Sequence, residues 1–127
     1  MNKKILLLLC TLLLCMYSCR DDDKSFLKTH EVSVGVEGKS LKIYGKEKFC
    51  LEEIVEFIGD DTIYPELDLY GLYDYQGSWY RISIDKDKKE MLINISENTS
   101  GKEKKLAILV CMPNSDISDG IFVKQVN

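Results

Sequence analysis

The sequence has few of the side chains that catalysis by an activated nucleophile requires. Its 127 residues include one histidine, His30, so no second imidazole is present to act as a general base. His30 also stands in a charged N-terminal segment, away from Cys50 and Cys111, the two later cysteines that could serve as nucleophiles. We therefore expect a protein that is not an enzyme.

An excess of positive charge is absent as well. The chain has 17 basic and 21 acidic residues, and without Lys3 and Lys4 of the N-terminal segment the balance is 15 to 21, a net charge of −6. An acidic surface is repelled by phosphate backbones, so nucleic acid is not expected as a partner.

No apolar run in the sequence is long enough to cross a bilayer. The run Ile5–Leu14 holds nine apolar residues in ten, whereas a spanning helix needs about 20. A short basic segment followed by a short apolar one is typical of a secretory signal peptide, which we predict for residues 1–18. The alternative is an uncleaved N-terminal anchor helix.

The end of this segment, MYSC at residues 16–19, resembles the lipobox of bacterial lipoproteins. In that family the cysteine receives a diacylglycerol group and the signal is cut just before it. The resemblance implies lipid attachment at Cys19 and a membrane partner held through acyl chains. Met16 and Tyr17 differ from the family's usual Leu and Ala or Ser.

A charged run, Arg20–Lys24, follows that cysteine. It resembles the signal by which Bacteroidota-type bacteria export lipoproteins to the outer face of the outer membrane. It suits a solvated tether equally well, because like charges repel and keep a chain extended. We assign residues 19–30 to a lipidated tether and residues 31–127 to one small domain.

The domain consists of short strand patterns separated by turn residues. Alternating apolar residues predict strands at 31–36, 41–44, 91–95, 106–110 and from 121 onward. Because a single hairpin is not stable alone, the strands are expected to form an all-β antiparallel sandwich.

Residues 50–58 can be interpreted in two ways. Leu51, Ile54 and Ile58 follow helical spacing, whereas Val55 and Phe57 alternate as in a strand. We favour a strand, with one short helix as the alternative.

The later strands carry a family resemblance. The matching segments are Trp79–Ser83, Met91–Asn98, Leu106–Val110 and Phe122–Gln125. They resemble the BACON domain, a Bacteroidetes-associated, often N-terminal, carbohydrate-binding module, and Lys104 or Lys105 stands where that family often has Arg. The resemblance covers residues 79–126. It implies an immunoglobulin-like β-sandwich, of about seven strands, on a surface lipoprotein, with glycan binding or a spacer role.

Candidate ligand-binding residues come from the aromatic run YGLYDYQGSWY at residues 70–80. Exposed aromatic rings are what sugar rings stack on, so Tyr73, Tyr75 and Trp79 are the candidate glycan-binding residues. The alternative is that these rings pack in the core.

The phase of the next strand bears on this choice. If Ile82 faces the core, alternation places Tyr80 inside and Trp79 outside, unless a bulge at residues 77–78 reverses the order. Residues 74–78 are predicted to form a turn with Tyr75 at its tip.

The remaining polar chemistry gives weaker predictions. Cys50 and Cys111 are expected either to form one disulfide, as suits an exported protein, or to stay as separate buried thiols. Asp85 and Asp87 stand in a lysine-rich turn, which disfavours calcium, so we predict no metal site and no cofactor. Thr62 fits a short pattern at which some of these bacteria O-glycosylate exported proteins.

Together these features predict a lipid-anchored outer-membrane protein, facing the cell surface, that binds a glycan or mucin. The alternative is a spacer or a protein-interaction subunit of a surface complex. Such a subunit would dock its partner on an exposed edge strand at residues 31–36.

Overall fold

The computed structural model describes residues 25–67 and 73–127, and it contains nine strands in these ranges. The strands are β1 (Glu31–Val34), β2 (Lys39–Tyr44), β3 (Cys50–Ile58), β4 (Asp61–Ile63), β5 (Asp74–Gln76), β6 (Tyr80–Asp85), β7 (Glu90–Ile95), β8 (Lys104–Cys111) and β9 (Ser118–Gln125). Within the described residues, no helix has the length and apolar character needed to span a membrane.

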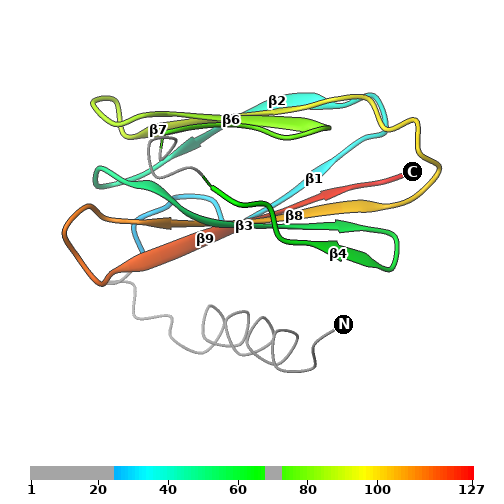
Figure 1. Cartoon of the computed structure of the whole chain (residues 1–127). Coiled ribbons are helices and arrows are strands. Elements are labelled where there is room, and N and C mark those ends of the chain that lie inside the picture. Colours follow the sequence, from blue (N-terminus) through cyan, green and yellow to red (C-terminus); the bar gives the residue numbers. More distant parts are fainter. Residues whose placement is uncertain (1–24, 68–72) are drawn as a thin grey trace.

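The strands form two facing sheets, and the expected all-β sandwich is confirmed (Figure 1). One sheet has the order β1-β9-β8-β3-β4 and the other the order β2-β7-β6-β5. Neighbouring strands run antiparallel except β1 and β9, which run parallel, so the prediction of a purely antiparallel sandwich is wrong at this edge.

The predicted number of strands, about seven, is too low for the described residues. The two strands that the sequence did not indicate, β4 and β5, have three residues each. Strands of this length carry too little alternation to be recognised from sequence.

Residues 50–58 form a strand along their whole length, so the helix alternative is wrong. The helical spacing has a simple cause in the pairing of β3 with β8. Leu51 lies opposite Val110 and Glu53 lies opposite Leu109, so Glu52 is an extra residue in a β-bulge. The bulge lets Leu51 and Ile54, three positions apart, both face the core.

The core lies between the sheets and follows from strand alternation. In β8, Leu106, Ile108 and Val110 are at most 1% exposed, while the residues between them are half-buried on the outer face. Ile82 on β6 and Ile93 on β7 are fully buried and cover them from the other sheet. The hydrophobic effect on these side chains accounts for the layered architecture.

Candidate functional site

The aromatic run does not form an exposed platform. Trp79 is 3% exposed and Tyr80 is 1% exposed, so both rings are in the core. Tyr80 faces inward as alternation predicts, but the expectation that Trp79 faces outward is wrong. Trp79 precedes the first residue of β6, so strand alternation does not constrain its side chain.

The burial of Trp79 is explained by two charged side chains on the opposite sheet. Its indole Nε1–H donates a hydrogen bond to Glu56 Oε1 at 3.1 Å, and Lys104 Nζ lies 5.2 Å from the ring centroid. An indole ring is positive at its edge and negative on its face, so both contacts are favourable. Glu56 and Lys104 are themselves buried, at 5% and 9% exposure.

Tyr80 completes the contacts of Glu56. Its hydroxyl donates to Glu56 Oε2 at 2.8 Å, and its ring meets the Trp79 ring edge-on at a centroid distance of 5.0 Å. Burial, together with the neighbouring Glu56 carboxylate, raises the pKa of the Tyr80 hydroxyl far above its ordinary value. Gly77 makes room for this ring, because a Cβ at that position would lie 2.5 Å from it.

Tyr73 and Tyr75 are both half-buried against the core. Residues 74–76 form β5 rather than the predicted turn, and Tyr75 lies opposite Ile82 on the inner face of the sheet. Its ring packs 5.9 Å from that of Tyr80, and Tyr73 has Lys86 Nζ 5.4 Å from its ring centroid. The structure therefore does not bring Tyr73, Tyr75 and Trp79 together as one exposed ligand surface.

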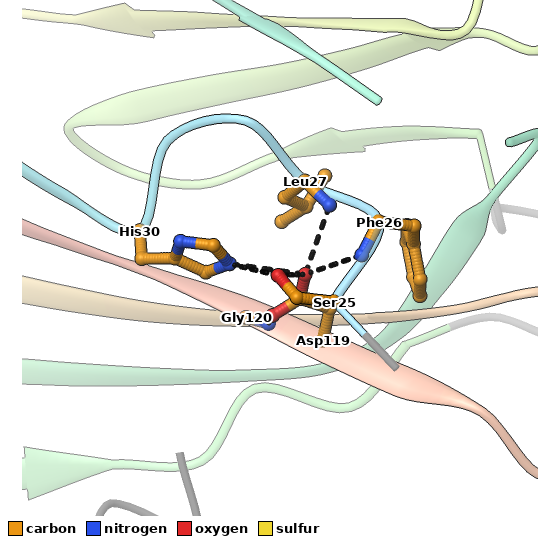
Figure 2. Close-up of polar contacts among 6 residues, drawn as sticks. All are labelled: Ser25, Phe26, Leu27, His30, Asp119 and Gly120. Atoms are coloured by element: carbon orange, nitrogen blue, oxygen red, sulfur yellow. Dashed lines mark hydrogen bonds and ion pairs between the residues drawn. The ribbon is translucent and has the colours of Figure 1, made fainter. Parts of the chain in front are cut away.

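A second polar cluster surrounds Asp119 on β9, and we call it the Asp119 clasp (Figure 2). Asp119 is 8% exposed, and its Oδ2 accepts hydrogen bonds from the backbone N–H groups of Phe26 at 3.0 Å and Leu27 at 2.9 Å. Ser25 Oγ donates to the same oxygen at 3.1 Å, and His30 Nε2 also lies 3.1 Å from it. The clasp fastens residues 25–30 to β9, so these residues belong to the domain and the predicted boundary at 30/31 is wrong.

The clasp contains a serine, a histidine and an aspartate, but its geometry is not that of a catalytic triad. A triad uses one imidazole nitrogen for the serine and the other for the aspartate. Here the single atom His30 Nε2 contacts both Ser25 Oγ, at 2.8 Å, and Asp119 Oδ2. Ser25 also donates directly to Asp119, so the arrangement holds the segment and leaves the serine without a base of its own.

Sequence reasoning missed both Glu56 and Asp119. For Asp119 a signal existed, since alternation from Ile121 and Val123 places it on the inner face of β9. A carboxylate at an inward position needs donors, and that requirement marks it as a structural or functional residue.

The outer face of the four-stranded sheet carries mostly polar side chains in rows that cross the strands. The first row follows the register from β2 to β5 and consists of Ser40, Asn94, Arg81 and Gln76. The second row consists of Lys42, Leu92, Ser83 and Asp74, and the third of Tyr44, Glu90 and Asp85. We call this surface the polar face.

Several side chains of the polar face are oriented by contacts with one another. Ser40 Oγ donates to Asn94 Oδ1 at 2.6 Å, and Arg81 pairs with Asp74 at 3.1 Å while both remain about half exposed. Ser83 Oγ also donates to Asp74, at 3.3 Å. Tyr44, 46% exposed, supplies an accessible aromatic ring in the third row.

Cys50 and Cys111 lie directly opposite each other in the pairing of β3 with β8, and their Sγ atoms are 3.5 Å apart. Both are free thiols in the structure. Burial, with Cys50 as a neighbour, raises the pKa of the Cys111 thiol to about 12.

The other predicted sites have separate outcomes. Thr62 is half-buried in β4, an edge strand, where it lies opposite Phe57, and its glycosylation stays a prediction. Cys19 and the predicted signal peptide lie outside the described residues. Within residues 25–67 and 73–127, no three His, Cys, Asp or Glu side chains cluster closely enough to hold a metal ion.

No family model and no curated protein matches the chain. Among solved structures, the NMR structure of a protein from Bacteroides thetaiotaomicron is similar, with a TM-score of 0.57 and 19% sequence identity. The match covers 77% of this chain and 76% of that one. At this level of identity the likeness shows the fold alone, and the BACON resemblance stays a prediction.

Proposed function

We propose that this chain is a non-enzymatic surface lipoprotein, anchored through Cys19, that binds an oligosaccharide on the polar face. The observation that carries the proposal is the first row of that face, in which Ser40, Asn94, Arg81 and Gln76 stand side by side across all four strands. This site replaces the one expected at Tyr73, Tyr75 and Trp79.

The chemistry of the row suits sugar hydroxyls, which both donate and accept hydrogen bonds. Asn94 offers a carbonyl oxygen and an amide NH₂, and Arg81 offers several N–H donors in a fixed plane. Gln76 offers its carbonyl oxygen, because its NH₂ group already donates to the backbone oxygens of Gly77 and Tyr80. Contacts with Ser40 and Asp74 hold Asn94 and Arg81 in place, which lowers the entropy lost when a ligand binds.

The size of the polar face also supports an oligosaccharide. Adjacent strands lie about 4.8 Å apart and strand residues rise about 3.3 Å, so three rows, two across four strands and one across three, cover at most roughly 13 Å by 14 Å. Tyr44 at one corner can stack its exposed ring against the apolar side of a sugar ring, while its hydroxyl stays free to form hydrogen bonds.

The test is binding of the full chain to a panel of immobilised oligosaccharides, with paired variants of the two sheets. Removing two polar contacts with Arg81→Ala and Asn94→Ala together should weaken binding about tenfold or more. The matched control is Ser33→Ala with Lys124→Ala, an exposed cross-strand pair on the outer face of the other sheet, which should bind normally. Binding that survives the first pair, or no binding to any glycan, contradicts the proposal.

The competing function is docking of a protein partner along β1. Among the described residues β1 is one of the two edge strands of the five-stranded sheet, where an extended peptide could add a strand. A defined surface protein that the chain retains equally well with and without Arg81→Ala and Asn94→Ala, in the absence of glycan binding, would favour this function.

A further inference from the structure

The two cysteines of the domain are direct cross-strand neighbours rather than two separate thiols. In β8 the inward residues are Leu106, Ile108 and Val110, so Cys111 faces outward, and Cys50 is its direct partner across the ladder. Opposite residues in an antiparallel pair have Cα atoms about 4.5–5.5 Å apart, and disulfides span about 4.4–6.8 Å. The backbone is therefore already in position for a bond between the two sulfurs.

The side chains are close to bonding geometry too. The Sγ atoms lie 3.5 Å apart, and Cys50 Sγ also points to the carbonyl oxygen of Cys111 at 3.6 Å. Closing the remaining gap to about 2.05 Å needs side-chain rotation only.

The pair is open to reagents from solvent. A cavity of about 550 Å³ is lined by both cysteines together with Tyr73 and residues 112–116 of the turn between β8 and β9. Cys50 is 7% exposed, whereas Cys111 is only half-buried. A disulfide-bearing partner entering this cavity meets Cys111 first.

We propose that Cys50 and Cys111 are a dithiol that a thiol–disulfide oxidoreductase, in its disulfide form, converts to a cross-strand disulfide. The Cys111 sulfur attacks one sulfur of the partner's disulfide, forms a mixed disulfide and releases the partner's other sulfur as a thiolate. The Cys50 sulfur then attacks Cys111 Sγ and expels the partner's first sulfur. The two cysteine protons pass to the two partner sulfurs, so the partner is reduced by two electrons and the dithiol is oxidised by two.

The environment of Cys111 sets the pace of this exchange. The attacking species is the thiolate, and the raised pKa of Cys111 keeps that thiol protonated at neutral pH. The uncatalysed reaction should therefore be slow near neutrality and become faster as pH rises toward that pKa.

The resulting bond would change the mechanics of the five-stranded sheet. Cys50 and Cys111 are 61 positions apart, and the segment between them includes strands of both sheets. A disulfide would close that segment into a loop. It would also hold β3 to β8 at the cavity mouth, where Cys50 and Cys111 are the last residue pair of the β3–β8 ladder.

The test uses the full chain, purified and fully reduced, with oxidised glutathione as the disulfide probe. After reaction, free thiols are blocked with N-ethylmaleimide and the peptides holding Cys50 and Cys111 are analysed by mass spectrometry. We expect one species that has lost two hydrogen atoms and joins the two peptides, formed faster at higher pH. Cys50→Ser should instead accumulate a glutathione adduct on Cys111, and Cys111→Ser should react more slowly at Cys50.

Two results would overturn the proposal. The first is blocking of both thiols by N-ethylmaleimide with no joined peptide at any pH. The second is a stable glutathione adduct on the unsubstituted chain, because it would mean that Cys50 cannot reach Cys111 Sγ.

The redox state of the two cysteines in cells has to be measured separately, because it depends on the export that the proposed function assumes. Chain blocked with N-ethylmaleimide before lysis should carry the disulfide if it is exported. A disulfide formed only in purified protein contradicts export to an oxidising compartment and leaves the dithiol chemistry supported.

Discussion

Glu56 and Asp119 are both carboxylates buried in the sandwich, yet the structure satisfies them in different ways. Glu56 accepts hydrogen bonds from two side chains, Trp79 and Tyr80, that belong to the opposite sheet. Asp119 accepts mainly from backbone N–H groups and polar side chains of residues 25–30, which precede the first strand. The first carboxylate joins sheet to sheet, and the second joins a chain segment to a sheet.

The difference predicts how each region responds to damage. The donors around Glu56 are enclosed between the sheets and cannot reach water unless the sandwich opens. The donors around Asp119 lie in a segment that precedes the first strand, and although its Phe26 and Leu27 side chains are buried in the core, we expect this segment to open before the two sheets unpair. Loss of Glu56 should therefore lower global stability, and loss of Asp119 should mainly release residues 25–30.

The largest effect is expected for Glu56→Ala. It leaves Trp79 Nε1–H and the Tyr80 hydroxyl buried without acceptors, at about 1–3 kcal/mol for each group, so the free energy of unfolding should fall by about 4 kcal/mol. Urea unfolding under reducing conditions measures this value. The control is Glu53→Ala on the exposed side of the same strand, which should change stability by less than about 0.5 kcal/mol. Equal effects of the two variants would mean that Glu56 does not join the sheets.

A smaller and local effect is expected for Asp119→Ala. The free energy of unfolding should fall by about 2 kcal/mol, because the freed N–H groups can bond to water once the segment detaches. Hydrogen exchange should show lost protection of the Phe26 and Leu27 amides, with the amides of β8 unchanged. Protection lost equally across β8 would contradict the distinction between the two carboxylates.

The smallest effect at neutral pH is expected for Tyr80→Phe, which removes one hydrogen bond to Glu56 and should cost about 1 kcal/mol. Its pH dependence is more informative. The pKa of the Tyr80 hydroxyl is raised in the folded state, so the folded protein stays protonated where the unfolded chain ionises. The free energy of unfolding therefore falls as pH rises above the unfolded pKa of 10.0.

The variant should therefore lose less stability than the unsubstituted chain as pH rises from about 9 to about 11. Both proteins should carry Cys111→Ser. The raised pKa of the Cys111 thiol would otherwise also make the free energy of unfolding fall as pH rises. If the free energy of unfolding of the two proteins changed with pH in parallel, ionisation of Tyr80 would not contribute to unfolding, and the prediction would be wrong.

The sequence was sufficient to predict the strands with clear alternation. Leu106, Ile108 and Val110 fall on one face in both the prediction and the structure, because a half-buried strand repeats every two residues. At Leu51 and Ile54 the same rule gives a misleading signal, since the bulge at Glu52 adds a residue that only the partner strand reveals.

The candidate site was less predictable because its contacts are distant in sequence, as between Ser40 and Asn94, which are 54 positions apart. The same holds for the two buried carboxylates. Trp79 and Glu56 are 23 positions apart, and Asp119 and Leu27 are 92 apart. The cysteines illustrate the same limit. Their residue types left both a disulfide and two separate thiols open, and the register of β3 with β8 is what brings their sulfurs together.

The Asp119 clasp has a mechanical consequence if the chain is anchored through Cys19, as we propose. Tension applied at Ser25 would peel β1, an edge strand, if the segment were attached through β1 alone. The clasp transfers the load to β9, an interior strand of the same sheet, while Lys28 N–H bonds to Tyr44 O at the end of β2 in the other sheet. We therefore expect a pull at Ser25 to load both sheets at once, so that the domain resists shear across several strands instead of unzipping from its edge.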